Sequence, residues 1–185
     1  MFDRQGNRKY LNSPERRAFL KSATIQSNLA EKTFCLTVFH TGCRISEALS
    51  VPCARLDVSE RTIIFETLKR RQEGLFRSVP IPDSLVRDLQ KLVSGKEPNA
   101  QIWDFSRVTG WRLIKRIMAR AKINGVRACP KGLRHGFAVE CIANAIPLTT
   151  LQKWMGHARL ETTAIYLQVM GAEERRLARR LWTGL

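Results

Sequence analysis

The sequence predicts an α+β fold that is mostly helical and contains one small antiparallel β-hairpin. Much of the chain carries apolar side chains at helical spacing, most clearly at residues 83–93. Two β-branched and aromatic stretches, 61–66 and 75–81, flank a basic tip at 68–74, which is typical of a hairpin. With 185 residues, 44% of them apolar, the chain is long enough for one well-buried domain.

Helix boundaries are predicted from polar caps, glycines and prolines. Ser13 is expected to be the N-cap of the first helix, because proline and glutamate follow it directly. Thr109 is expected to cap a helix over 110–122, and Thr149 or Thr150 to cap a short helix that ends before Gly156. The remaining predicted helices span residues 29–40, 45–49, 83–93, 131–146 and 172–185.

The charge balance favours a polyanionic partner. The chain has 32 Lys and Arg against 16 Asp and Glu, a formal net charge of +16 with a pI near 10.6. Nucleic acid is therefore the first candidate and an anionic membrane surface the second. No apolar run approaches the length of a membrane span, and the N-terminus has no signal-peptide core, so we expect no membrane partner.

The cysteines indicate a reducing compartment. Five cysteines are scattered along the chain without the close pairing typical of a zinc site. Reduced thiols of this kind are usual in the cytoplasm, where we expect the protein to be.

A group of residues near the C-terminus suits chemistry on a phosphodiester. Lys131 and Arg134 are three residues apart, as on one face of a helix, and His157 precedes Tyr166 by nine residues. An arginine forms a planar fork for two phosphate oxygens, and a lysine or histidine supplies a proton or another donor. A tyrosine hydroxyl can attack phosphorus and keep the bond energy in a phosphoester.

A second group lies at the start of the predicted helix 45–49. Arg44 follows a break at Gly42 and is flanked by apolar residues, which is unusual for an arginine on a solvated face. Glu47, three residues later, is expected either to orient an arginine or to be an ordinary charge on the helix surface.

These blocks resemble the conserved boxes of the tyrosine recombinase (phage integrase) family. The segments K-x-x-R, M-G-H and T-T-x-x-Y at residues 131–166 resemble the family's C-terminal boxes, and T-G-C-R-I-S-E at 41–47 resembles its first box. The likeness runs from about Leu11 to about Tyr166. It implies the family's catalytic-domain fold at 13–171. The basic arm at 1–12 leaves no room for the separate N-terminal core-binding domain that usually precedes this fold, so we expect either a catalytic domain that stands nearly alone or a fragment of a longer protein.

The resemblance also implies roles for individual residues. Arg44 and Arg134 would clamp the phosphate, and Tyr166 would attack it to leave a 3′-phosphotyrosine. The family places a catalytic lysine on a hairpin ahead of an R-x-V-P strand, which maps to Lys69 as general acid. Lys131 and His157 would assist proton movement and bind the phosphate. No metal or other cofactor is expected, because the implied site is cationic.

Two further expectations follow from the resemblance. Lys131 stands where the family most often has histidine, and a lysine charged near neutrality is a poor proton acceptor. Strand exchange joins four protomers on two double-stranded DNA segments, so a homotetramer on DNA is expected. The amphipathic helix at 172–185 would support this assembly or cover its own core, through an apolar side formed by Leu177, Leu181, Trp182 and Leu185.

Alternative functions remain open at this level. The same chemistry would serve a type IB topoisomerase, and the same fold would serve a non-catalytic DNA-binding regulator. The intact set of presumed site residues speaks against the regulator. Tyr10 lies in the polar arm and is not expected to be the nucleophile, and His40 and His135 are expected to be structural.

Overall fold

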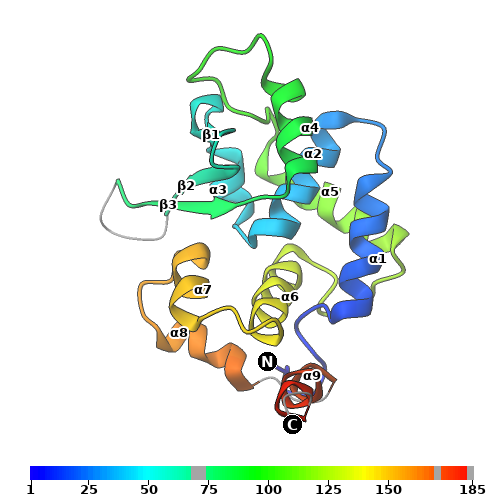
Figure 1. Ribbon diagram of the computed structural model, residues 1–185. Helices are drawn as coiled ribbons and strands as arrows, with labels where there is room; N and C mark the ends of the chain where they lie inside the picture. The colour runs from blue at the N-terminus through cyan, green and yellow to red at the C-terminus, as the bar shows by residue number, and fades with distance from the viewer. Residues whose placement is uncertain (68–73, 169–171, 183–185) are drawn as a thin grey trace.

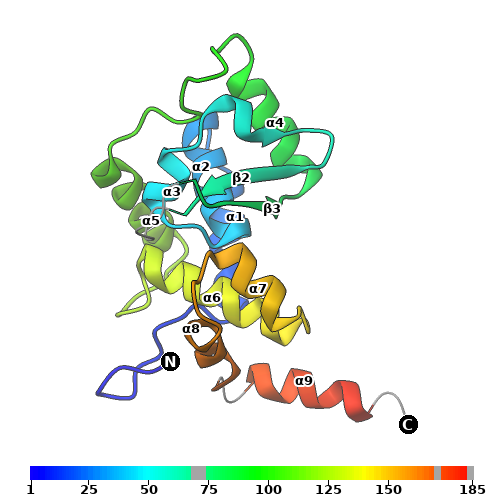
Figure 2. The same ribbon diagram turned by 90° about the vertical axis from the view of Figure 1, so that its left-hand side faces the viewer.

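The computed structural model describes residues 1–67, 74–168 and 172–182, and it confirms a mostly helical α+β fold. In Figures 1 and 2 the small sheet and the helices α2–α5 lie above the helices α6–α8. The helices are α1 (Ser13–Thr24), α2 (Leu29–Thr41), α3 (Ile45–Leu49), α4 (Asp83–Val93), α5 (Arg107–Arg120), α6 (Pro130–Ala143), α7 (Leu148–Met155), α8 (Glu161–Ala164) and α9 (Ala172–Trp182), with 3-10 turns η1 (Cys53–Arg55) and η2 (Ile165–Gln168).

The predicted hairpin is the centre of a three-stranded antiparallel sheet. Strand β2 (Thr62–Glu66) pairs with β3 (Phe76–Pro80), and β1 (Leu56–Asp57) adds a short edge. Ile63 lies opposite Val79, and Phe65 lies opposite Arg77. All four side chains are buried, so this face of the sheet packs against the interior. Strand β1 was not predicted, because two residues are too few to show a period.

The buried apolar side chains of the described residues form two clusters. The larger cluster lies among α1–α5 and the sheet, where Phe34 meets Trp103 edge to face with ring centroids 5.7 Å apart. The smaller cluster joins α6, α7 and η2 and contains Phe137, Met155 and Tyr166. Trp154 packs against both clusters and thereby links the upper and lower parts of the fold.

Several predicted helix ends need correction. The N-cap of α1 is Asn12 and not Ser13, because Glu15 completes a capping box with the residue three positions before it. Ser106 and not Thr109 caps α5, where its hydroxyl accepts the Thr109 N–H at 3.1 Å. No threonine caps α7, which begins directly after Pro147. Helix α6 ends at Ala143, earlier than expected.

The two ends of the chain differ in how they pack. Tyr10 and Leu11 belong to the predicted arm at 1–12, yet both are buried, and the Leu11 N–H donates to the Gly132 carbonyl at 3.3 Å. The inner end of that segment is therefore part of the core. Helix α9 contacts α6, but its Leu181 and Trp182 are exposed. The side chain of Leu177 and all of Leu185 lie outside the described residues. Across the described helices, no apolar stretch is long enough to span a membrane.

At Gly42 the fold requires a glycine both for its backbone conformation and for the space around it. It ends α2 in the left-handed region with φ of +61°, and a Cβ there would lie 2.4 Å from the Phe137 ring. Gly95 also has a left-handed φ, of +79°, but a Cβ added there would have no atom within 4 Å. Left-handed backbone costs an alanine ~1–2 kcal/mol, and forcing atoms into a packed core costs a further ~1–3 kcal/mol.

We therefore expect Gly42→Ala to lower the free energy of unfolding by more than Gly95→Ala does. Chemical denaturation of both variants measures the difference. Equal losses would show that Phe137 moves aside freely and that close packing at Gly42 is not required.

Candidate active site

The site is organised around the carboxylate of Glu47, which is fully buried on α3. Its oxygens bind Arg44 Nη1 at 2.5 Å and Arg77 Nη2 at 2.6 Å, and Arg134 Nη1 lies 4.0 Å away. Burial acts to raise the pKa of the carboxyl. Arg77, the Arg44 backbone N–H and the other two guanidinium groups more than offset this and hold the pKa below its usual value. The interpretation of Glu47 as an arginine-orienting residue is confirmed.

Arg44 is placed by the break between α2 and α3. Gly42 turns the chain, and Arg44 then becomes the N-cap of α3 with extended backbone. Its backbone N–H donates to Glu47 Oε2 at 2.9 Å, which fixes the turn. Its side chain is still 25% exposed, so the guanidinium is anchored on one side and open to solvent on the other.

Arg134 on α6 is buried and held by main-chain carbonyls. Its Nη1 donates to the Gly42 carbonyl at 2.6 Å and its Nη2 to the Met155 carbonyl at 2.7 Å. These bonds connect α6 to the ends of α2 and α7. Burial, and next the charge of Arg44, lower the pKa of Arg134 to about 10, so it remains a cation at neutral pH.

His157 follows Gly156, the left-handed C-cap of α7. Its Nε2 lies 3.2 Å from Arg134 Nη2, and its Nδ1 lies 2.8 Å from the hydroxyl of buried Thr163. A guanidinium can only donate, so Nε2 accepts and Nδ1 carries the proton. Burial, with Arg134 and Arg44 nearby, lowers the pKa of His157 to about 4.

Tyr166 on η2 is 2% exposed and lies against this cluster. Its ring is parallel to the His157 ring, with centroids 6.5 Å apart. Its hydroxyl is 2.8 Å from Nδ1 of His135. Burial raises the pKa of the phenol, and Arg134 and Arg44 act in the opposite direction. The structure thus brings Arg44, Arg134, His157 and Tyr166 into one cluster.

Of the two lysines predicted to belong to the site, the structure describes only Lys131. Lys131 is exposed on the first turn of α6, near enough to His135 to lower the pKa of that imidazole. Lys69 lies outside the described residues. Thr67, the last described residue before that gap, accepts a hydrogen bond from Arg77 Nη1 at 3.0 Å.

Two residues of the cluster were missed at the level of sequence. Arg77 is buried, donates to the Trp154 carbonyl at 2.8 Å and ties β3 to α7. Strand alternation puts Arg77 on the same face as buried Val79, which was an available signal. His135 was expected to be structural, but it lies one helical turn after Lys131 and contacts the Tyr166 hydroxyl.

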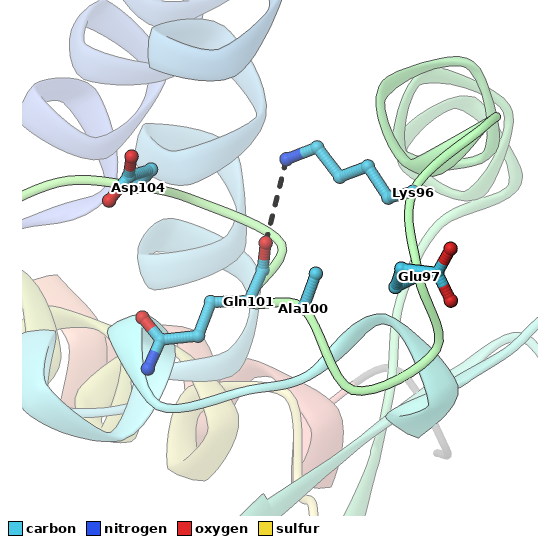
Figure 3. Close-up of a pocket in the computed structure, with 5 residues that line it drawn as sticks. All are labelled: Lys96, Glu97, Ala100, Gln101 and Asp104. Atoms are coloured by element: carbon cyan, nitrogen blue, oxygen red, sulfur yellow. Dashed lines mark hydrogen bonds between the residues drawn. The ribbon is translucent and has the colours of Figure 1, made fainter.

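A pocket elsewhere in the structure is separate from this site. Figure 3 shows a pocket lined by the segment that connects α4 to α5, where Lys96 Nζ lies 3.5 Å from the Gln101 carbonyl oxygen. Its lining contains none of the predicted site residues. Among the described residues, no three His, Cys, Asp or Glu side chains gather in a way that could hold a metal ion.

A mostly helical domain in which a buried tyrosine lies against a histidine–arginine cluster corresponds to the catalytic domain of tyrosine recombinases. The model of the phage integrase family matches residues 9–173, and the chain belongs to this family. A tyrosine recombinase of Thermosipho africanus is 26% identical over 170 residues, which cover 89% of this chain and 59% of the relative.

Solved structures show the same fold. A XerA recombinase superposes with a TM-score of 0.79 at 23% identity, over 92% of this chain and 64% of that one. The Tn1549 transposon integrase in complex with transposon right end DNA gives a TM-score of 0.71 at 18% identity, over 93% of this chain and 65% of that one. The chain spans about three-fifths of the length of these relatives.

The three histidines predict how stability depends on pH. Burial is the first cause that lowers the pKa of His40, His135 and His157, each to about 4 from an ordinary 6.5. Between those values the unfolded chain binds protons that the folded chain does not, so stability falls as pH falls.

We expect the free energy of unfolding to decrease from pH 7 to pH 5, with each imidazole contributing at most ~1.4 kcal/mol per pH unit. Urea titrations at a series of pH values measure this slope. A free energy that stays level over this range would contradict the burial of neutral imidazoles.

Proposed function

We propose that this domain cuts and rejoins DNA through a 3′-phosphotyrosine, as a site-specific recombinase or integrase in the cytoplasm. The observation that carries the proposal is the continuous contact from Tyr166 through His157 to Arg134, with Arg44 held beside it by Glu47. The residues proposed as nucleophile and as phosphate-binding cations thus lie in one cluster. Membership of the phage integrase family and the net charge of +16 support double-stranded DNA as the partner.

In this proposal, the arginines stabilise the charge that develops on the phosphate. Arg44 uses the exposed side of its guanidinium, and Arg134 acts from a position fixed by two carbonyls. Their positions are set before the phosphate arrives, so little reorganisation is needed during the reaction. His157 presents a neutral imidazole between Arg134 and the Tyr166 ring. Lys69 protonates the leaving 5′-oxygen, Lys131 binds the phosphate, and no cofactor takes part.

We further propose that the domain works as a homotetramer on DNA. Leu181 and Trp182 at the end of α9 are exposed in the single chain, and Ile165 and Leu167 on η2 expose apolar side chains as well. Burying one such side chain against a second protomer contributes roughly 1.5–3 kcal/mol. These residues support an assembly surface at the C-terminal end of the chain.

A covalent adduct tests the proposed chemistry. The protein is incubated with a pool of duplexes of randomised sequence, each nicked so that the cut 5′-hydroxyl strand diffuses away and the adduct is trapped. Adducts that survive denaturant are recovered and sequenced. We expect the wild-type chain to form them and Tyr166→Phe to abolish them with DNA affinity unchanged, because the phenol oxygen is the attacking atom.

Tyr10→Phe is the matched control, since the chain has two tyrosines and both are buried. This variant should form adducts at the wild-type level. Adducts that persist in Tyr166→Phe would contradict the assignment of the nucleophile, and the absence of adducts in the wild-type chain would contradict the proposed function.

A further inference from the structure

The Tyr166 hydroxyl has a specific partner that the family resemblance did not assign. His135 is on α6, directly after Arg134, and its Nδ1 lies 2.8 Å from the hydroxyl oxygen. The two rings are tilted by 55° with centroids 5.6 Å apart, so the imidazole edge meets the phenol oxygen. An atom of His135 therefore touches the atom that would attack phosphorus.

The other two candidate proton acceptors are poorly suited to this task. His157 accepts from Arg134 through Nε2, and its Nδ1–H faces Thr163. Lys131 carries an ammonium group, which has three donors and no acceptor. The geometry leaves His135 as the base in contact with the nucleophile.

We propose that His135 is the general base of the cleavage step, and this proposal rests on the proposed function. As the Tyr166 oxygen bonds to phosphorus, its proton passes to Nδ1 of His135. The bond from phosphorus to the 5′-oxygen breaks, and that oxygen takes a proton from the general acid. In rejoining, the 5′-hydroxyl attacks phosphorus and returns its proton to the group that acted as general acid, the bond to Tyr166 breaks, and His135 returns its proton to the phenol oxygen.

The surroundings of His135 fit a base that acts only during the attack. Burial first, then the charges of Lys131, Arg134, the N-terminal amine and Lys9, lower its pKa to about 4, so it is a neutral acceptor at neutral pH. Burial also keeps the phenol protonated until it attacks. An incoming phosphate brings negative charge among these cations, which favours the imidazolium that forms.

The first test reads the hydrogen bond without DNA. The chain has three histidines, so ¹⁵N-histidine NMR can assign the protonated nitrogen of each ring. We expect an unprotonated Nδ1 in His135 and a protonated Nδ1 in His157. In Tyr166→Phe, the Nδ1 resonance of His135 should move as its donor disappears. A proton on Nδ1 of His135 in the wild-type chain would overturn the proposal, because the imidazole would then donate to the phenol.

The second test separates proton transfer from positioning. An asparagine at 135 offers an oxygen close to where Nδ1 lies, but it cannot take up the proton. We expect His135→Asn and His135→Ala both to slow adduct formation by roughly 10²–10⁴-fold, the usual contribution of a general base. His40→Asn is the matched control, because His40 is a partly buried imidazole on α2, outside the site, and should retain the wild-type rate.

A substrate with sulfur in place of the bridging 5′-oxygen identifies which proton is involved. Such a leaving group needs no general acid, so it should not rescue His135→Asn. Rescue by sulfur, or a wild-type rate in His135→Asn, would overturn the assignment of His135 while leaving the proposed function intact. If the wild-type chain forms no adduct with any duplex, the proposed function fails and the base assignment fails with it. Thermal melts of each variant confirm that the compared chains are folded.

Discussion

A single buried carboxylate holds the site together. Glu47 contacts arginines from three separate elements: Arg44 at the start of α3, Arg77 on β3 and Arg134 on α6. Arg77 also reaches the Trp154 carbonyl on α7, so the sheet and both parts of the fold meet at this point. Removing one partner of a buried ion pair is costly, typically ~3–5 kcal/mol, because the remaining charge is left without compensation. The arrangement of the site is therefore tied to the integrity of the fold.

The charge at this point also explains why an anion would bind there. Three guanidinium groups share one carboxylate, which leaves the cluster with a formal excess of positive charge. Arg77 is enclosed by Glu47, Thr67 and the Trp154 carbonyl, whereas Arg44 keeps an exposed side. One arginine thus stabilises the structure while another remains available to a phosphate. The imidazole of His157 accepts a hydrogen bond from Arg134, and its ring stacks with the ring of Tyr166, so Tyr166 lies next to this cationic cluster.

Much of the fold could be predicted because the spacing of apolar residues within a short stretch of sequence indicates a helix or a strand. Helices α3 and α4 were predicted with their observed bounds, and the strands of the hairpin to within one residue at either end. Arg44, Arg134, His157 and Tyr166 were chosen from motif spacing, and they lie together, although their roles stay predictions. The contacts of Arg77 with Glu47 and of His135 with Tyr166 join residues 30 and 31 positions apart. Such pairings arise only when helices and strands pack, so no local period could reveal them.

The central claim is that Glu47 and Arg77 depend on each other inside the fold. A double-mutant cycle with Glu47→Gln, Arg77→Met and the double variant measures their coupling energy by chemical denaturation. The same cycle on Glu31 and Arg116, an ion pair with 26% and 44% of the two side chains exposed, is the control. The account predicts a coupling of ~1–3 kcal/mol for the buried pair, against ~0.2–1 kcal/mol for the exposed one. A coupling between Glu47 and Arg77 no larger than that of the exposed pair would contradict it.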